Sequence, residues 1–285
     1  MTHRYRAAGF TLDSDIAFST LAPALDAGAP AVIFRRCARD EVVGVGMVTR
    51  NFAYGAVDGR QVGVWTSDAA TDEAVGRGVP IGALNAIAYQ RGLLPLHAAA
   101  VAVGDTCVAF CGDAGAGKST LVAALARAGH RVICDDLLVL HPSPAGWLAW
   151  PADTRPKLTA ASLALLGGGV EALSEPAAWD GKARTRPGAA AADAPRRLTA
   201  IYLLAWGDET RLTRLPALQA AGLMTRALRK PEWLDRVEAA RDVRQRWLEL
   251  VAEVPVILAT RPPGAAAFPD LPAALLGSWT AEEMR

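Results

Sequence analysis

The first 78 residues alternate short apolar runs with turn-forming residues, a pattern typical of short strands. The clearest runs are residues 31–34, 42–48 and 62–65. Asp58 and Gly59 give a turn signal between two of these runs. The stretch carries no grouping of catalytic residue types. We therefore predict a small β-rich N-terminal domain over residues 1–78 and a second domain over residues 79–285.

The pattern then changes to one in which helices and strands alternate. Apolar residues recur at helical spacing over residues 81–90, before Gly92, and predict a helix that leads into a strand over residues 95–101. The segments that follow are an apolar strand over 107–111, a helix over 118–128 closed by Gly129, and a strand over 131–134. This order of strand, glycine-rich loop, helix and strand predicts an α/β fold.

The second half of the chain continues with apolar segments and one long irregular stretch. The predicted elements are a strand over 137–140, a helix over 158–166, a strand over 198–206, a helix from 231 to about 252, and a strand over 254–259. Residues 167–195 are rich in Gly, Ala and Pro, with Lys182 and Arg184 among them. We predict that this stretch is a mobile loop or lid whose order depends on a ligand.

Composition narrows the possible partners. The 285 residues are 52% hydrophobic and 21% charged, with a formal net charge of +1. This balance gives no overall field that would attract nucleic acid or anionic lipid, so we expect neither as a partner. The apolar runs are too short to cross a bilayer, and the N-terminal residues lack an apolar signal segment, so we expect a cytoplasmic protein. The four cysteines contain no CxxC pair and are interpreted as buried free thiols rather than a metal site.

Residues 112–119 carry the strongest chemical signal. They read Gly-Asp-Ala-Gly-Ala-Gly-Lys-Ser and match G-x-x-x-x-G-K-[ST] at every fixed position, between a predicted strand and a predicted helix. The predicted nucleotide-binding residues are Gly112, Asp113, Ala114, Gly115, Ala116, Gly117, Lys118, Ser119 and Thr120. Lys118 would reach the β- and γ-phosphates, and Ser119 would ligate Mg²⁺. The alternative is a glycine-rich turn that binds nothing.

Two acids follow the predicted P-loop helix and strand. Asp135 and Asp136 come 17 and 18 residues after Lys118, so a right-handed crossover would bring both carboxylates to the phosphate site. One could hold Mg²⁺ with Ser119, while the other accepts a proton from an incoming hydroxyl. The alternative is a structural cap after the strand. His97 is a further candidate, or else a hydrogen-bonded core histidine.

Four basic residues are candidates to meet the charge on the γ-phosphate during transfer. They are Arg155, Lys157, Lys182 and Arg184. The alternative is that they are ordinary solvated side chains.

Taken together, Leu96-His97, residues 111–120 and residues 129–136 resemble the catalytic core of the HPr kinase/phosphorylase family. The resemblance implies a P-loop kinase core of the HPr kinase/phosphoenolpyruvate carboxykinase type. It implies that Lys118 and the loop amides bind ATP phosphates, that Ser119 and Asp136 hold Mg²⁺, that Asp135 is the base, and that His97 lies near the reacting phosphate. Ala98 replaces the family's usual glycine, and no Arg-Gly-Leu-Gly-like stretch follows the acids, which argues against HPr as acceptor and against phosphorolysis.

A divergent branch matches the flanking residues better. Residues 89–97 and 150–158 look like those of HPr-kinase-related proteins that act on ribosomally made peptides, above all the lasso-peptide precursor kinases. The resemblance implies an ATP- and Mg²⁺-dependent kinase in which Asp135, His97 and Lys118 are catalytic residues, acting on a serine near the C-terminus of a precursor peptide. Lys182, in the predicted lid, is the fourth residue that we predict to be catalytic. The alternatives are a kinase of HPr or of a small hydroxylated metabolite such as serine, and a nucleotide-binding regulatory module without catalysis. A precursor peptide or small protein is thus the expected partner, and homo-oligomerisation stays open.

Overall fold

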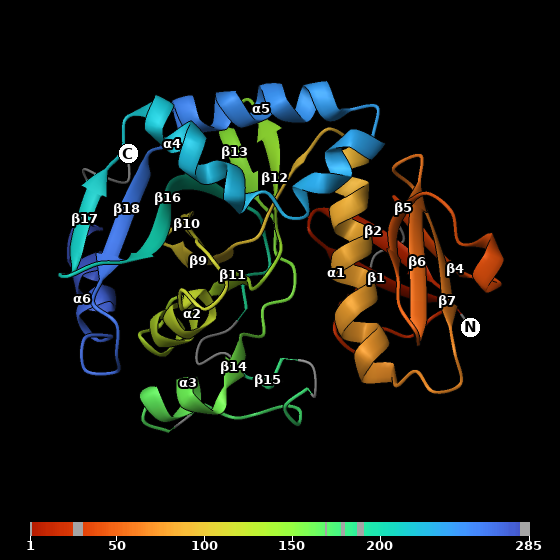
Figure 1. Cartoon of the computed structure of the whole chain (residues 1–285), viewed down its shortest axis with the longest axis horizontal. Coiled ribbons are helices and arrows are strands. Elements are labelled where there is room, and N and C mark those ends of the chain that lie inside the picture. The colour runs from red at the N-terminus through yellow and green to blue at the C-terminus, as the bar shows by residue number, and fades with distance from the viewer. Residues whose placement is uncertain (1, 25–30, 169, 178–179, 187–190, 280–285) are drawn as a thin grey trace. The chain divides into compact units, whose positions relative to one another are not determined.

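The computed structural model describes residues 2–24, 31–168, 170–177, 180–186 and 191–279 (Figure 1). The chain divides into two compact units. Unit 1 consists of Met1–Pro95, Val139–His141 and Arg229–Trp247, and unit 2 of Leu96–Leu138, Pro142–Leu228 and Leu248–Arg285. No helix among the described residues is long and apolar enough to span a membrane.

Unit 1 is built on a seven-stranded sheet with the order β3-β1-β2-β4-β7-β6-β5. Its strands are β1 (His3–Ala7), β2 (Phe10–Ser14), β3 (Ala22–Pro23), β4 (Val32–Arg36), β5 (Val45–Val48), β6 (Phe52–Val57) and β7 (Gln61–Thr66). A short 3-10 helix, η1 (Arg39–Glu41), follows β4. The β-rich character predicted for the front of the chain is confirmed, and the apolar runs near residues 31, 42 and 62 correspond to β4, β5 and β7.

The long helix α1 (Asp72–Gln90) packs against β5, β6 and β7 of the same sheet (Figure 1). Thr71 caps its start by accepting a hydrogen bond from the Ala74 N–H at 3.2 Å. A Cβ at Gly82 would overlap the Tyr54 phenol, so glycine lets the helix approach β6 closely. The structure therefore differs from the boundary predicted at residue 78. The helix runs across that position without a break, and residues up to 95 belong to unit 1.

Unit 2 contains most of a nine-stranded sheet. Seven of its strands follow the order β11-β9-β10-β16-β13-β12-β8. In addition, β16 pairs with β18, and β18 pairs with β17. Its strands are β8 (Leu94–Leu96), β9 (Ala99–Val103), β10 (Thr106–Cys111), β11 (Val132–Cys134), β12 (Leu138–Ser143), β13 (Gly146–Ala149), β16 (Arg196–Trp206), β17 (Arg211–Arg214) and β18 (Val256–Arg261). The strands β8 and β12 carry residues of both units. The strand predicted over residues 95–101 is interrupted at His97, which follows β8 and precedes β9.

Strand direction decides which residues meet at one edge of this sheet. β10 is parallel to β16, and β16 is parallel to β18. β9 is antiparallel both to β10 and to β11, so β11 runs in the same direction as β10. The carboxyl ends of β10, β11, β16 and β18 therefore lie at the edge where β9 begins. Segments from five separate parts of the chain are brought to that edge.

The helix α2 (Lys118–Arg127) follows β10 and packs against β9 (Figure 1). One apolar core includes Leu121 and Leu125 of α2, Phe110 of β10, and Leu271 and Leu275 of α6 (Asp270–Ser278). Gly129, at φ +99, ends the helical segment as predicted. The predicted burial of Cys107, Cys111 and Cys134 is confirmed; Cys37 is half-buried, and all four cysteines are free.

A small two-stranded sheet, β14 (Lys157–Thr159) and β15 (Lys182–Arg184), stands beside α3 (Ala160–Leu165) in unit 2. It corrects two predictions. The segment predicted as a helix over 158–166 begins as a strand, and Thr159 then caps α3 by accepting a hydrogen bond from the Ser162 N–H. The stretch 167–195 is not uniformly a loop, because Ala183, Arg184 and Thr185 are buried within it. Residues 169, 178–179 and 187–190 of that stretch lie outside the described residues.

The segment predicted as one helix from residue 231 is divided in two. A 3-10 helix, η3 (Pro231–Arg236), is followed by extended backbone at Val237, with φ −125° and ψ 139°, before α5 (Ala240–Glu253) begins. Two further helices, α4 (Ala217–Met224) and η2 (Thr225–Ala227), precede this segment. The last residue of η2 contacts His97, whose N–H donates to the Ala227 carbonyl at 2.7 Å.

Candidate functional site

The predicted P-loop joins the carboxyl end of β10 to the amino end of α2. Gly112, Gly115 and Gly117 have φ values of +142°, +84° and +93°. A Cβ at Gly112 would lie 2.7 Å from the Leu204 carbonyl oxygen of the neighbouring strand β16, so no larger residue fits there. The Ala116 N–H donates to the Asp113 carbonyl at 3.1 Å and closes the turn. The backbone of residues 112–117 thus bends sharply just before the amino end of α2.

The amino end of α2 directly follows this bend and offers free backbone N–H groups. Gly117 is the N-cap residue and supplies no side-chain cap, and the first helical hydrogen bond runs from the Leu121 N–H to the Gly117 carbonyl at 2.8 Å. The N–H groups of Lys118, Ser119 and Thr120 precede that bond and point out of the helix end, where they favour an anion. The Thr120 hydroxyl turns away and donates to Ser162 Oγ at 3.0 Å.

Lys118 reaches back across the loop. Its Nζ donates to the Gly112 carbonyl at 2.8 Å and to the Asp113 carbonyl at 3.3 Å. Burial lowers the pKa of Lys118, and the nearby charge of Lys182 acts in the same direction. The loop therefore holds a buried ammonium group against neutral carbonyl oxygens, which a phosphate oxygen would replace as a stronger acceptor.

Ser119 is paired with Asp135, the first of the two acids. Its Oγ donates to Asp135 Oδ1 at 2.8 Å, and the second oxygen of the same carboxyl group accepts from the Lys157 N–H at 2.9 Å. Asp135 is 2% exposed, and burial raises the pKa of its carboxyl group, while the positive charge of Lys157 acts against that rise. A hydroxyl and a carboxylate at this separation form the oxygen donor set that suits Mg²⁺.

Asp136 is oriented differently because its backbone is left-handed, with φ +84°. Its Oδ1 lies 3.0 Å from His97 Nδ1, and its Oδ2 accepts from Lys157 Nζ at 2.9 Å. The Asp136 side chain is 23% exposed and that of His97 is 34% exposed. The structure thus brings His97 and both acids together, but it pairs Ser119 with Asp135, whereas the resemblance implied Ser119 with Asp136.

The four basic candidates divide into two kinds. Arg155 Nε lies 3.0 Å from Asp153 Oδ1, and Arg184 Nη2 lies 3.0 Å from Asp153 Oδ2, so both guanidinium groups are anchored on that acid. Asp153 is 4% exposed, and its carbonyl accepts from the Asp135 N–H at 2.7 Å. This backbone hydrogen bond joins Asp153 and its two ion pairs to the acid that follows β11. Lys157 pairs with Asp136, and the charge of Lys182 acts on Lys118.

Sequence reasoning missed three residues of this edge. Asp153 anchors the arginines, and its position two residues before Arg155 was the available signal. Trp206 ends β16 and Arg261 ends β18, at the edge that carries the predicted P-loop. Trp206 was predicted only as part of an apolar strand, and Arg261 lies two residues beyond another predicted strand.

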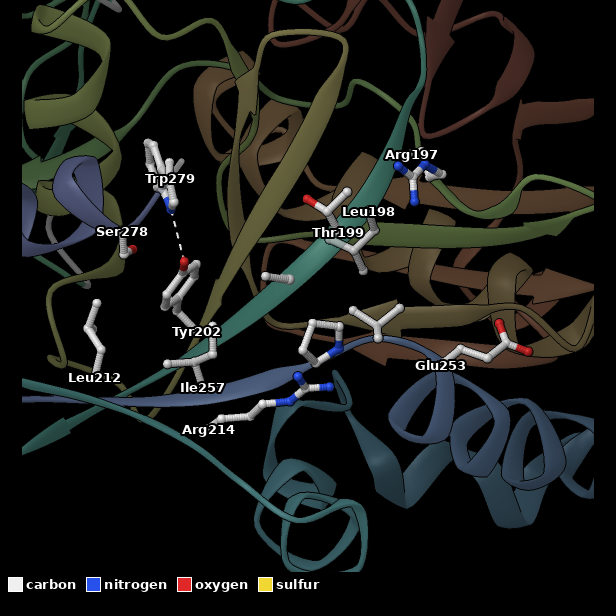
Figure 2. A pocket seen from close by; sticks show the side chains of 13 residues that line it. Arg197, Leu198, Thr199, Tyr202, Leu212, Arg214, Glu253, Ile257, Ser278 and Trp279 are labelled. Atoms are coloured by element: carbon white, nitrogen blue, oxygen red, sulfur yellow. Dashed lines mark hydrogen bonds between the residues drawn. The ribbon is translucent and has the colours of Figure 1, made fainter. Parts of the chain in front are cut away.

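A separate cavity of about 590 Å³ lies in unit 2 at the other end of the strands (Figure 2). Arg197, at the beginning of β16, and Arg214 of β17 line it, and Trp279 Nε1 donates to the Tyr202 hydroxyl at 2.9 Å within it. Arg197 pairs in register with Thr106 at the start of β10, so the predicted P-loop, at the other end of β10, lies at the opposite edge. Among the described residues, no cluster of three or more His, Cys, Asp or Glu side chains could hold a metal ion. An ion at Ser119 and Asp135 would need further ligands from a phosphate or water.

Comparisons with known proteins add a structural likeness. No protein-family model matches the chain, and no curated protein matches it in sequence. Among solved structures, the Hpr(Ser) kinase/phosphatase from Coxiella burnetii matches with a TM-score of 0.32 and 14% identity. The match covers 64% of this chain and 90% of that chain. A likeness of this size does not assign an activity.

Proposed function

We propose that this protein is an ATP- and Mg²⁺-dependent phosphotransferase whose acceptor is a hydroxyl group. The observation that carries the proposal is the pairing at one sheet edge: Ser119 Oγ lies 2.8 Å from the buried Asp135, and the adjacent Asp136 lies 3.0 Å from His97. A nucleotide sensor needs the first pair to hold Mg²⁺. A second, solvent-accessible carboxylate beside a histidine has no role in sensing, whereas phosphoryl transfer needs such a group to receive a proton.

Each residue receives a role from its contacts. The N–H groups at the start of α2 and Lys118 Nζ would bind the β- and γ-phosphates, and Ser119 and Asp135 would hold Mg²⁺. Mg²⁺, when bound, neutralises charge on the phosphates. Asp136 would accept the proton of the acceptor hydroxyl on a carboxylate oxygen, held in place by His97 and Lys157. This assignment exchanges the roles that the family resemblance implied for Asp135 and Asp136.

The basic side chains of the small sheet would stabilise the negative charge on the phosphoryl group during its transfer. Lys157 pairs in register with Arg184, and Thr159 with Lys182, so Lys157, Arg184 and Lys182 share one face of the antiparallel pair. Lys182 acts electrostatically on Lys118. We assign Lys182 to the charge on the transferred phosphoryl group, and the anchored Arg184 to holding β15 in position.

For the acceptor we propose a peptide serine, near the C-terminus of a ribosomally made precursor peptide of the lasso type. This part rests on the sequence resemblance of residues 89–97 and 150–158. Free serine is the second acceptor to be tried, because the same base would serve any primary hydroxyl.

The test is phosphoryl transfer from ATP labelled at the γ-phosphate, in Mg²⁺, to a synthetic precursor peptide, to the same peptide with alanine replacing the serine, and to free serine. We expect label on the serine peptide alone. Lys118→Ala should abolish transfer and weaken ADP binding at least about tenfold, because it removes the loop's ammonium group. Arg131→Ala is the matched control, since this exposed cation pairs with Asp193 away from the loop. Unchanged ADP binding and transfer in Lys118→Ala would refute the proposal.

A further inference from the structure

We propose that Trp206 and Arg261 form the site for the nucleoside end of the nucleotide, with the base stacked on the exposed face of Trp206. The inference deepens the proposed function and rests on it. Trp206 is the last residue of β16 and Arg261 the last of β18, and the two pair in register in the parallel sheet. Both therefore stand at the sheet edge that carries the P-loop.

The two side chains are organised as a stacking platform. The Arg261 guanidinium carbon lies 4.1 Å from the centroid of the Trp206 ring and 5.6 Å from that of Phe268. Arg261 covers one face of the indole, yet Trp206 is 51% exposed. Arg261 thus contacts one part of a large aromatic surface, and the rest of that surface is open to solvent. Every nucleobase offers a flat π-face to such a surface.

The charge of Arg261 points to the same ligand. Arg261 is 7% exposed, its one side-chain hydrogen bond is a 3.4 Å contact to the Pro262 carbonyl, and it makes no ion pair with any carboxylate of the described chain. Burial lowers the pKa of Arg261. A buried guanidinium group without an anion is unfavourable. A Cβ at Gly117 would lie 3.1 Å from its Nη2, so the group is beside the last glycine of the P-loop.

Position along the edge separates this platform from the reacting groups. The P-loop strand β10 has β9 on one side, followed by β11, and these two bring His97, Asp135 and Asp136. On its other side lie β16 and then β18, which bring Trp206 and Arg261. A nucleotide whose γ-phosphate faces the acids must extend its nucleoside away from them, and the β16 side is where the chain offers an aromatic surface.

The experiment compares two ligands that differ in the nucleoside. ADP and inorganic tripolyphosphate, each with Mg²⁺, are titrated into the full-length wild type and into Trp206→Ala, Trp206→Phe and Arg261→Lys, by calorimetry. We expect Trp206→Ala to weaken ADP binding roughly 5- to 100-fold and to change tripolyphosphate binding less than about twofold. Trp206→Phe should restore most of the ADP affinity. Arg261→Lys keeps the charge and loses the planar stack, so it should weaken ADP binding more than tripolyphosphate binding.

Trp65→Ala is the matched control, because Arg39 lies over the Trp65 ring at 4.8 Å in an equivalent pair of unit 1. Its affinities should equal those of the wild type. ADP affinity unchanged in Trp206→Ala, or equal losses for ADP and tripolyphosphate, would overturn the inference while leaving the P-loop assignment intact. Both ligands binding Lys118→Ala as tightly as wild type would instead refute the proposed function, and this inference with it.

Discussion

Exchanging one carboxylate at a time for an amide separates a metal ligand from a base. Asp135→Asn should be tolerated by the fold, because an amide oxygen can still accept from the Lys157 N–H and the Ser119 hydroxyl can accept instead of donate. Asp136→Asn should also fold, since asparagine is among the residues that best tolerate the φ of +84° at that position. Both substitutions therefore test chemistry rather than stability.

The expected losses differ in kind. Asp136→Asn removes the group proposed to take the acceptor proton, so transfer to the serine peptide should fall by about 10² to 10⁴-fold while the affinity for Mg²⁺ and ADP stays near wild type. Asp135→Asn removes one negative charge from the proposed Mg²⁺ ligands. It should raise the Mg²⁺ concentration for half-maximal rate, and high Mg²⁺ should recover part of the activity.

Initial rates with labelled ATP over a Mg²⁺ series, together with ADP titrations, give both quantities. Ser119→Ala supplies the internal check, because it should share the Mg²⁺ phenotype of Asp135→Asn and not the rate phenotype of Asp136→Asn. If Asp136→Asn shifts the Mg²⁺ requirement and Asp135→Asn loses only rate, the assignment drawn from the Ser119 contact is refuted. Full activity in both variants would make the pair a structural cap.

Two further predictions concern packing and charge. Gly82→Ala should lower the free energy of unfolding by about 1 to 3 kcal/mol through overlap with Tyr54, whereas Gly222→Ala in α4, where a Cβ meets nothing within 4 Å, should raise it by about 0.5 to 1 kcal/mol; urea unfolding checks both, and shifts of the same sign would contradict the packing. Lys182→Ala should lower transfer more than ADP affinity, because ADP lacks the γ-phosphate. Equal losses of rate and ADP affinity, measured by calorimetry and labelled transfer, would place Lys182 at the other phosphates.

The parts of the site that depend on local sequence could be predicted. The geometry of the predicted P-loop needs glycines at fixed positions, a strand before the loop and a helix start after it, and all of these lie within residues 106–127. The start of α1 could not be read, because Gly76, Gly78, Pro80 and Gly82 weaken the helical signal, and only packing against β6 explains two of those glycines.

Contacts between distant segments explain the remaining differences. The order within residues 167–195 comes from pairing of β15 with β14, and neither three-residue strand has a signal of its own. Which acid meets Ser119 depends on the left-handed backbone at Asp136, which turns that side chain toward His97. Trp206 and Arg261 meet because two parallel strands are in register, which no local pattern indicates.

The reversed strand β9 links the histidine to the P-loop. Its register with β10 pairs Ala99 with Phe110 and Val103 with Thr106, across a tight turn at Gly104. The pairing ends at Ala99 and Phe110, which lie two residues after His97 and two residues before Gly112, so the strand pair brings the histidine and the start of the loop to the same edge. Because side chains alternate along a strand, a slip of one residue would reverse the faces of β9 and carry His97 away from Asp136. The short turn at Gly104 therefore sets the register of β9. This register decides both which side chains of β9 enter the core and where His97 lies.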